Sequence, residues 1–569
     1  MKANIFLICF AIILIISKQS FSQIDSTTLN SSNITNTITL NRSTTYLMKG
    51  FNYVKNGSTI IIQAGTKIFG DFNTKGTLII ERGAKIYANA NAGDPIVFTS
   101  RQPIGQRKAG DWGGIIILGR SGINTATGVD SAEIEGFGAG LGPVYGGQPR
   151  IDDDSSGVFR YVRLEFPGVN LTGVTGNEIN GLTMGGIGSR TVIEYVQVSY
   201  SGDDSYEWFG GNVNCKYLIA YKGLDDDFDA DNGYRGRVQF GLSVRDSAIA
   251  DVSSSNGFEI DNNVNTPSNF NSPRTRAIFS NITVVGPFIT TSSIVNPLFQ
   301  RGAHLRRNML ASIYNSIIMG WRVGIRFDGA GVGSAAQADT VQLRNNILAG
   351  NLRLADSTGT GSFAPHTWLQ NSSFGNSIFA NNTDIQLTSP FNIYPDVPLP
   401  ANNVNYWIPL GSSPALSGSS FANPNLNGFE VVSYRGAFGT ENWTSGWSQF
   451  NPKSYEVIGI NQISSIVPDK FSLSQNYPNP FNPSTHLEFG LPAEASAQAG
   501  ISSTAGGSGF VSLKVYDMLG KEVASLVNSN LSPGIYKYDF DASGLTSGIY
   551  FYTLKVDGFS ETKRMMLLK

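Results

Sequence analysis

Charged residues, histidine and cysteine are all scarce in this sequence. Of its 569 residues, 15% are charged, three are histidines and two are cysteines. The chain has no Gly-x-Ser-x-Gly, His-Glu-x-x-His or paired-cysteine motif. Nucleophile-elbow hydrolases, zinc proteases of the His-Glu-x-x-His type and cysteine-bound zinc sites are therefore excluded as explanations of its chemistry.

A surplus of positive charge and long helical stretches rich in Leu, Ala, Glu and Lys are also missing. The formal net charge of −2 provides no general basic surface, so we predict no nucleic-acid partner. The 41% of apolar residues can bury large cores in more than one domain. Because Gly, Asn, Ser and Thr are abundant, we expect short strands joined by tight polar turns, and hence an all-β protein.

The N-terminal residues 1–22 have the pattern of a cleavable signal peptide. An apolar run from Ile5 to Ile16 is followed by Ser20 and Ser22, small residues at the two positions that a signal peptidase reads, and we expect cleavage between Ser22 and Gln23. The run is shorter than the roughly 20 residues that a bilayer requires, and no later segment is apolar enough to span one. We therefore predict an exported protein without a transmembrane segment.

Cysteine usage fits neither a disulfide nor a catalytic thiol. Cys9 lies within the signal peptide, which leaves Cys215 without an internal partner. The apolar stretch 215–219 around Cys215 favours a buried structural thiol over a reactive one.

Internal repeats are the most informative feature of the middle of the chain. Residues 60–68 (IIIQAGTKI) recur 18 residues later as residues 78–86 (LIIERGAKI), each a short apolar strand, a glycine turn and a second strand. Longer repeats follow at intervals of 22 to 35 residues, with apolar positions at Val162, Val196, Leu218, Ile249, Ile282, Ile317, Ile347 and Ile378. Because these segments alternate with period 2 and are broken by Gly and Asn, they predict stacked coils of a parallel β-helix and exclude a helical solenoid.

Two of these segments also point to a known fold. Residues 76–86 (GTLIIERGAKI) and 95–100 (PIVFTS) resemble the pectin-lyase-like right-handed parallel β-helix proteins, and the resemblance covers roughly residues 50–440. It implies the fold, and we assign residues 23–450 to this β-helix. Lyases, hydrolases, adhesins and capping structures all use the fold, so the resemblance implies no activity.

A different composition begins after a linker at 451–469. Within residues 470–569, alternating strands at 511–516, 536–540 and 550–556 are separated by turn residues. This pattern predicts a small antiparallel β-sandwich.

Four segments stand in a fixed order in this C-terminal domain: residues 477–481 (YPNPF), 513–523 (LKVYDMLGKEV), 545–552 (LTSGIYFY) and 563–569 (KRMMLLK). Together they resemble the type A sorting domain of type IX secretion cargo. The departure from that pattern is the Ser/Ala/Gly stretch 493–508, which we interpret as an enlarged hairpin loop. An accessory glycan-binding β-sandwich is the alternative.

The resemblance to sorting domains implies an export route and its partners. The chain would pass through the periplasm and the outer membrane, the secretion machinery would recognise the domain, and a sortase would remove it. The product would be attached to surface lipopolysaccharide or released. The tail residues implied as the sorting signal are Lys563, Arg564, Leu567 and Lys569.

Residues 224–233 (LDDDFDADNG) are the best candidate site in the β-helix. If the apolar residues between them point into the coil, Asp227, Asp229 and Asp231 share its outer face about 6.5–7 Å apart. Three carboxylates there repel one another unless a cation lies among them, and Ca²⁺ prefers such oxygen ligands. Asn232 stands where an EF-hand requires glycine, which excludes that motif.

Three interpretations of this acidic segment stay open. It holds a structural Ca²⁺, it is a solvated acidic turn neutralised by Arg235 and Arg237, or it supplies catalytic carboxylates. We predict Ca²⁺ as the cofactor that the segment favours, with no other cofactor implied.

Neighbouring coils extend the candidate site. Glu259, Asp261 and Arg326 are expected on the outer face, where equivalent positions on successive coils lie about 4.8 Å apart. Asp229, Glu259 and Asp261 could serve a glycoside hydrolase, and Arg326, Arg235 or Arg237 could be the base of a Ca²⁺-dependent uronate lyase. The segment Gly202-Asp203-Asp204 resembles part of the polygalacturonase pattern, but His304 lacks the flanking glycines of that family's Gly-His-Gly motif.

These observations favour a secreted or cell-surface β-helix protein that binds polysaccharide or extracellular matrix. The alternative is a polysaccharide lyase or glycoside hydrolase that uses the same acidic face. A purely structural or adhesive surface protein is the third hypothesis. Whether the chain is an enzyme is left open, with binding favoured over catalysis.

Overall fold

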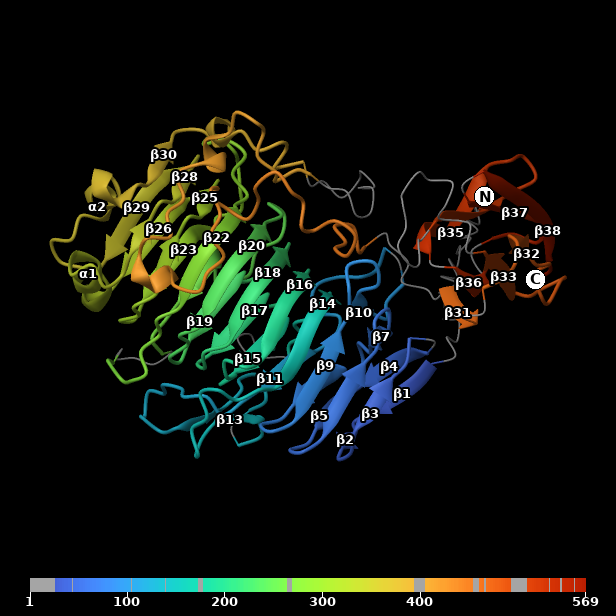
Figure 1. Ribbon diagram of the computed structural model, residues 1–569, viewed down its shortest axis with the longest axis horizontal. Helices are drawn as coiled ribbons and strands as arrows, with labels where there is room; N and C mark the ends of the chain where they lie inside the picture. Colours follow the sequence, from blue (N-terminus) through green and yellow to red (C-terminus); the bar gives the residue numbers. More distant parts are fainter. Residues whose placement is uncertain are drawn as a thin grey trace, which may run out of the picture. The chain divides into compact units, whose positions relative to one another are not determined.

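The protein is built almost entirely from β-strands (Figure 1). The computed structural model describes residues 26–569, apart from 43, 104, 139, 172–177, 264–268, 393–404, 454–459, 465–466, 493–508, 532, 543–544 and 557. The signal peptide with its Ser22–Gln23 cleavage site and the 493–508 insertion thus lie outside the described residues. The described chain divides into two compact units, Ser26–Asn461 and Gln462–Lys569.

The first unit is a parallel β-helix, as predicted. Its described residues form two long sheets in which every strand pair is parallel. The eleven-stranded sheet contains β2 (Asn33–Ile34), β5 (Phe51–Val54), β8 (Thr77–Ile80), β11 (Gly114–Leu118), β15 (Leu182–Gly185), β17 (Tyr206–Phe209), β19 (Phe228–Asp231), β21 (Ser255–Ile260), β23 (Phe299–Arg306), β26 (Val323–Asp328) and β29 (Arg353–Thr358).

The seventeen-stranded sheet contains β1 (Ser26–Asn30), β3 (Ile38–Leu40), β4 (Thr45–Lys49), β6 (Thr59–Ile62), β7 (Lys67–Gly70), β9 (Lys85–Asn89), β10 (Ile96–Ser100), β14 (Gly157–Glu165), β16 (Val192–Ser199), β18 (Asn214–Tyr221), β20 (Arg237–Val244), β22 (Ile278–Val285), β24 (Ser312–Tyr314), β25 (Ile317–Met319), β27 (Leu343–Arg344), β28 (Ile347–Ala349) and β30 (Ser377–Phe379). Two short helices, α1 (Ala330–Gln337) and α2 (Pro365–Leu369), follow late coils. The core lies between the two sheets. It is filled by inward side chains, and those at equivalent positions of successive coils form columns along the β-helix.

Aromatic residues fill the core on the side of the eleven-stranded sheet. The rings of Tyr206, Phe228 and Phe258 stack in one inward column, with centroids 5.7 and 5.4 Å apart. Trp208 and Trp407 are also buried in this core. These tryptophans are therefore core residues and are not available to stack on a sugar ring.

One repeat position predicted from the sequence is wrong. Ile249 follows β20 in a loop, and the residue in register between Leu218 and Ile282 is Gly241. A Cβ atom at Gly241 would lie 2.9 Å from the Ile282 side chain and 3.2 Å from the Phe228 ring. The large inward Phe228 ring thus requires glycine opposite it. This glycine interrupts the column of apolar residues that marks the repeats in the sequence.

Residues 405–453 run back along the outer face of the seventeen-stranded sheet, and we call them the strap. Side-chain amides of successive coils hold it. Asn315 donates to Ser420 O (3.1 Å), Gln239 to Glu430 O (2.8 Å), Asn281 to Tyr434 O (2.9 Å) and Gln197 to Gln449 O (2.7 Å). Near its end, Pro452 O accepts from Arg107 Nη1 at 3.2 Å. The strap therefore contacts coils from the late β24 region back to residues that precede β11.

A second covering segment lies on the other sheet. Residues 120–156, which we call the excursion, contain the hairpin of β12 (Ser131–Glu133) and β13 (Val144–Gly146). Tyr145 and Ile134 of the excursion are buried against Ile116 and Phe209 on the outer face of the eleven-stranded sheet. The excursion thus shields the early and middle coils of that face.

The second unit contains two four-stranded antiparallel sheets. One has the order β31 (Ile460–Ser464), β36 (Gly534–Asp541), β33 (Ser484–Leu491), β32 (Ser472–Leu473). The other has the order β35 (Glu522–Leu531), β34 (Gly509–Tyr516), β37 (Gly548–Val556), β38 (Phe559–Leu567). The predicted antiparallel C-terminal domain is confirmed. The predicted linker 451–469 spans the division between the units, and part of it lies outside the described residues.

The buried thiol of Cys215 provides a simple test of the core. Cys215 lies in β18 with 1% of its surface exposed, and burial raises its pKa to about 12. Because alkylation requires a thiolate that is accessible, we expect no reaction with iodoacetamide in native buffer at pH 8 and complete reaction in guanidinium chloride, measured by mass spectrometry. Stoichiometric alkylation of the native protein within minutes would contradict this packing.

Candidate functional site

Charged side chains form one column along the outer face of the eleven-stranded sheet. The strand register aligns Glu207, Asp229, Glu259, His304, Arg326 and Asp356, and we call these six residues the outer column. They face outward because their neighbours along each strand, such as Phe228 and Ala230, are buried in the core. The column changes from acidic on the earlier coils to mixed charge on the later ones.

Turns that precede β17 and β19 add more carboxylates beside this column. We define the acidic cluster as Asp203, Asp204, Glu207, Asp225, Asp226, Asp229 and Glu259. Its ligand oxygens lie within 4.8 Å of one another in three groups: Asp203, Asp204 and Asp225; Asp204, Glu207 and Asp229; Asp226, Asp229 and Glu259. Asp204 and Asp229 each belong to two groups, so the three groups form one continuous patch of oxygen ligands.

Burial and mutual repulsion hold protons on this cluster. Burial, followed by the charges of neighbouring carboxylates, raises the pKa values of Asp204, Glu207 and Asp229 well above their usual range. Burial and the charge of Glu259 raise the pKa of Asp226 to about 7. Without a cation, the cluster therefore keeps protons at neutral pH, and a divalent ion would replace them.

The excursion brings one further carboxyl group to the cluster. Glu135 is exposed at the surface, but its carboxyl group shares hydrogen bonds with Asn180 and Glu207, and desolvation of that group raises its pKa to about 7. Asn180 also donates to Glu207 through its side-chain amide. The acidic cluster is thus bordered on its early side by the covering segment.

Basic residues border the cluster on its late side. His304 lies between two carboxylates, with Nδ1 3.2 Å from Glu259 and Nε2 3.2 Å from Asp328. Arg306 forms ion pairs with Glu259 and Asp261. Although burial opposes it, the hydrogen bond from His304 and the charge of Arg306 lower the pKa of Glu259. Glu259 is therefore the ionised end of the cluster.

The expected placement of Asp227 on the outer face is wrong. Its side chain is fully buried, with Oδ2 2.9 Å from Arg245 Nε and hydrogen-bonded to Ser243. The strand alternation that places Asp229 outside begins only at Phe228, where β19 starts, and Asp227 belongs to the turn before it. Asp229 does face outward. Asp231 follows it with 2% of its surface exposed, and its Oδ1 has no hydrogen-bond partner among the residues that the structure describes.

The arginines proposed as neutralising partners or as bases contact other groups. Arg235 pairs with Asp152 of the excursion at 2.6 Å, and Arg237 lies over the Phe429 ring of the strap at 5.9 Å. Arg326 binds Asp356, with Nε 2.6 Å from Oδ1. The interpretation that Arg235 and Arg237 neutralise the acidic segment is therefore not supported by their positions. Arg245 has that role for Asp227.

The remaining catalytic candidates are only partly brought together. Asp229 and Glu259 meet in one group of the cluster, whereas Asp261 is engaged by Arg306 and Arg307 at 2.8 and 2.7 Å. Arg306, which contacts two candidate carboxylates, was missed from the sequence. Aligning residues 301–306 with the strands of the two adjacent coils would have placed His304 and Arg306 beside these acids.

Comparison with known proteins identifies both units. Residues 32–385 match a family described as a pectate-lyase-like β-helix domain, and residues 475–568 match one described as a secretion system C-terminal sorting domain. No curated protein and no solved structure matches the chain. Among the described residues, no helix is long and apolar enough to cross a membrane.

Proposed function

Because the chain belongs to the pectate-lyase-like β-helix domain family and has a secretion sorting domain, we propose that it binds an extracellular polysaccharide through Ca²⁺ held in the acidic cluster. The sorting domain directs export through the periplasm to the cell surface or the medium by the type IX secretion machinery.

The observation that supports a cation most strongly is the overlap of three carboxylate groups within 4.8 Å. Ca²⁺ takes six to eight oxygen ligands, and three carboxylate side chains leave some of those positions open. Sugar hydroxyl or carboxylate oxygens can fill them. A cation in this cluster would therefore link the protein to a glycan.

Asn256 provides a second, independent indication of a cation. It is 1% exposed and donates its amide to Asp226 and Glu259, both at 3.3 Å, while its Oδ1 has no hydrogen-bond partner in the described part of the chain. A flip of this amide would turn Oδ1 toward the same two carboxylates. The side chain would then supply a fourth oxygen ligand to an ion held by Asp226, Asp229 and Glu259, in place of the two hydrogen bonds that its amide group donates.

Catalysis is the second candidate function. Asp229 and Glu259 are adjacent carboxylates, as a glycoside hydrolase requires. However, Arg306 binds Glu259 and Arg326 binds Asp356, so neither arginine is free to remove a proton as a lyase base. Binding is therefore favoured over a lyase or hydrolase, and a purely structural or adhesive role is the outcome if no glycan binds.

Asp229→Asn tests the proposed function, because Asp229 belongs to two of the three carboxylate groups. We expect Ca²⁺ affinity, measured by isothermal titration calorimetry, to fall at least tenfold, since one charged ligand is lost from both groups. Glycan binding should require Ca²⁺ and weaken in the same variant, without product release.

The matched control is Asp153→Asn, which removes an exposed carboxylate paired with Arg190. Its Ca²⁺ affinity should equal that of the parent protein. No heat on adding Ca²⁺ to the parent protein would refute the cation site, and release of shortened sugars would favour the enzyme instead.

We also propose which tail residues the secretion machinery reads. Leu567 is fully buried at the end of β38, whereas Arg564 and Lys569 are exposed and Lys563 is partly exposed. Leu567 would then stabilise the domain, and the three basic residues would contact the machinery or its sortase. Removal of the domain and attachment to lipopolysaccharide belong to the same proposal.

A further inference from the structure

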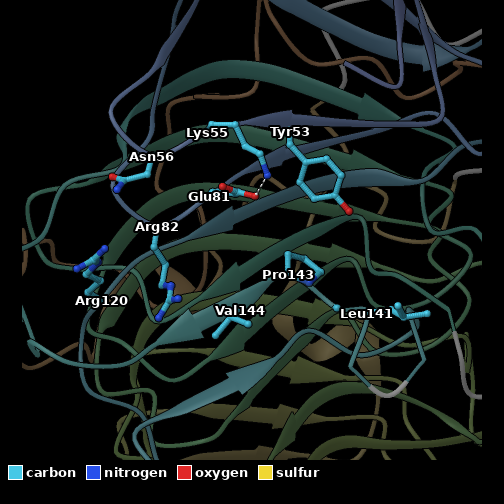
Figure 2. Close-up of a pocket in the computed structure, with 10 residues that line it drawn as sticks. Tyr53, Lys55, Asn56, Glu81, Arg82, Arg120, Leu141, Pro143 and Val144 are labelled. Carbon is cyan, nitrogen blue, oxygen red and sulfur yellow. Dashed lines mark hydrogen bonds and ion pairs between the residues drawn. The ribbon is translucent and has the colours of Figure 1, made fainter. Parts of the chain in front are cut away.

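A cavity of about 470 Å³ lies on the outer face of the eleven-stranded sheet, far along the sheet from the acidic cluster (Figure 2). It is formed by β5, the turn after β8, Arg120 after β11, and residues 141–144 of the excursion. Tyr53 lies in the same register column as Glu207, with Ile79, Ile116 and Thr183 between them. Four strand spacings separate the two, which is about 19 Å.

The charges that line this cavity are mostly positive. Lys55 forms an ion pair with Glu81, the one acidic residue of the lining. Arg82 donates through Nη1 to Gly146 O at 2.8 Å, and its remaining donors have no carboxylate partner among the described residues. Within the same described part of the chain, the Arg120 guanidinium has neither an ion pair nor a hydrogen bond. Two guanidinium groups thus lie at one end of the cavity without an anion.

The proximity of these guanidinium groups has an electrostatic cost. Burial, and then the charge of Arg120, lower the pKa of Arg82. An anion bound between them would remove this repulsion. Arginine is suited to the purpose because its planar donors bind a carboxylate, sulfate or phosphate in a bidentate manner.

The other end of the cavity holds an aromatic ring and an aliphatic side chain, beside the Lys55–Glu81 ion pair. Figure 2 shows Tyr53 and Leu141 on the side away from Arg82 and Arg120. Leu141 is 73% exposed, and the Lys55 ammonium lies 4.7 Å from the centre of the Tyr53 ring. An aromatic ring and an aliphatic side chain beside a charged end match a ligand that has both an apolar face and an anionic group, as an acidic sugar does.

We propose that this cavity binds the anionic group of an acidic sugar, a uronate carboxylate or a sulfate ester, between Arg82 and Arg120, with the sugar ring packed on Tyr53. The site goes beyond the proposed cation-dependent binding because it requires no metal ion. It would select acidic over neutral polysaccharides.

The test is calorimetric titration of the purified full chain after divalent ions have been removed on a chelating resin, in a buffer without polycarboxylates. The probes are a uronic-acid tetrasaccharide, a sulfated tetrasaccharide, a neutral tetrasaccharide of equal length and inorganic phosphate. We expect at least one acidic tetrasaccharide to bind at least tenfold more tightly than the neutral one, since charge-assisted hydrogen bonds contribute this much. The Arg82→Gln/Arg120→Gln variant should lose the difference, and Arg190→Gln, at an exposed arginine paired with Asp153, should retain it.

Each other outcome overturns the inference. Equal binding of acidic and neutral sugars removes the anion site, as does unchanged selectivity in the double variant. Phosphate that binds as tightly as the acidic sugars makes the site one for bare anions. If the double variant fails to fold, the salt dependence of the parent protein decides, because only the acidic sugar should bind more weakly as NaCl rises from 50 to 500 mM. The absence of divalent ions keeps these results separate from those on the acidic cluster.

Discussion

Replacing Arg245 by methionine is expected to lower the free energy of unfolding by about 3 to 5 kcal/mol. Arg245 is among the largest fully buried side chains of the protein. It neutralises Asp227 and donates to backbone carbonyls, among them Gly223 O at 2.9 Å. Methionine would leave a buried carboxylate and several carbonyl oxygens without partners. The midpoint of urea denaturation, with Ca²⁺ held constant, measures the loss.

Two further variants identify the cause of this loss. Arg237→Met removes an exposed arginine from β20, the strand that ends directly before Arg245, and should change stability by less than about 1 kcal/mol. The double variant Asp227→Asn/Arg245→Met should be more stable than Arg245→Met alone, because the buried charge is then absent. A loss of less than about 1 kcal/mol in Arg245→Met would show that the pair does not stabilise the turn before β19.

In a chelating buffer, the melting temperature is expected to fall as pH rises from 5 to 8. Carboxyl groups of the acidic cluster have a higher pKa in the folded than in the unfolded chain, about 7 for Asp226 against an ordinary 3.8. The folded state therefore binds more protons than the unfolded state between pH 5 and 8. The stability that these protons add is fully present below the pKa of the groups in the unfolded chain, and it is lost as pH rises through their pKa in the folded protein. Differential scanning calorimetry at several pH values measures the change.

Saturating Ca²⁺ should reverse this fall, and more strongly at pH 8 than at pH 5, because protons compete with the ion. A ligand at one hundred times its dissociation constant stabilises the folded state by about 2.7 kcal/mol per site. Asp229→Asn should reduce the effect and Asp153→Asn should not. A melting temperature that rises with pH in the chelator, or that ignores Ca²⁺ at pH 8, would contradict a cation-binding cluster.

The β-helix and its outward acids could be predicted because they follow from local pattern. Strand alternation around Phe228 and Ala230 places Asp229 outside. The same rule failed for Asp227, which lies in a turn where alternation does not apply. It also failed at Gly241, where the size of Phe228, which is distant in sequence, decided the residue. His304 and Arg306 required the register of β23 against β21, which single-strand patterns do not contain.

The strap and the excursion were least predictable, since neither is periodic. The strap is held by single side-chain amides, such as those of Gln197, Asn281 and Asn315, and each meets a carbonyl more than 100 residues away. The cavity beside Arg82 and Arg120 exists only because the excursion returns over the early coils. Long-range contacts of this kind leave no local signal in the sequence.

The strap also changes how the β-helix should unfold. In a solenoid held only by contacts between adjacent coils, either end can fray without disturbing the middle. Here one continuous segment is bonded to coils from Arg107 to Asn315, so the coils between these two residues cannot separate before several of its bonds break together. Unfolding should accordingly be more cooperative than in an unbraced solenoid, and the brace can form only after the coils on which it rests. An exported protein that meets proteases outside the cell gains from this, because partly opened forms are rare.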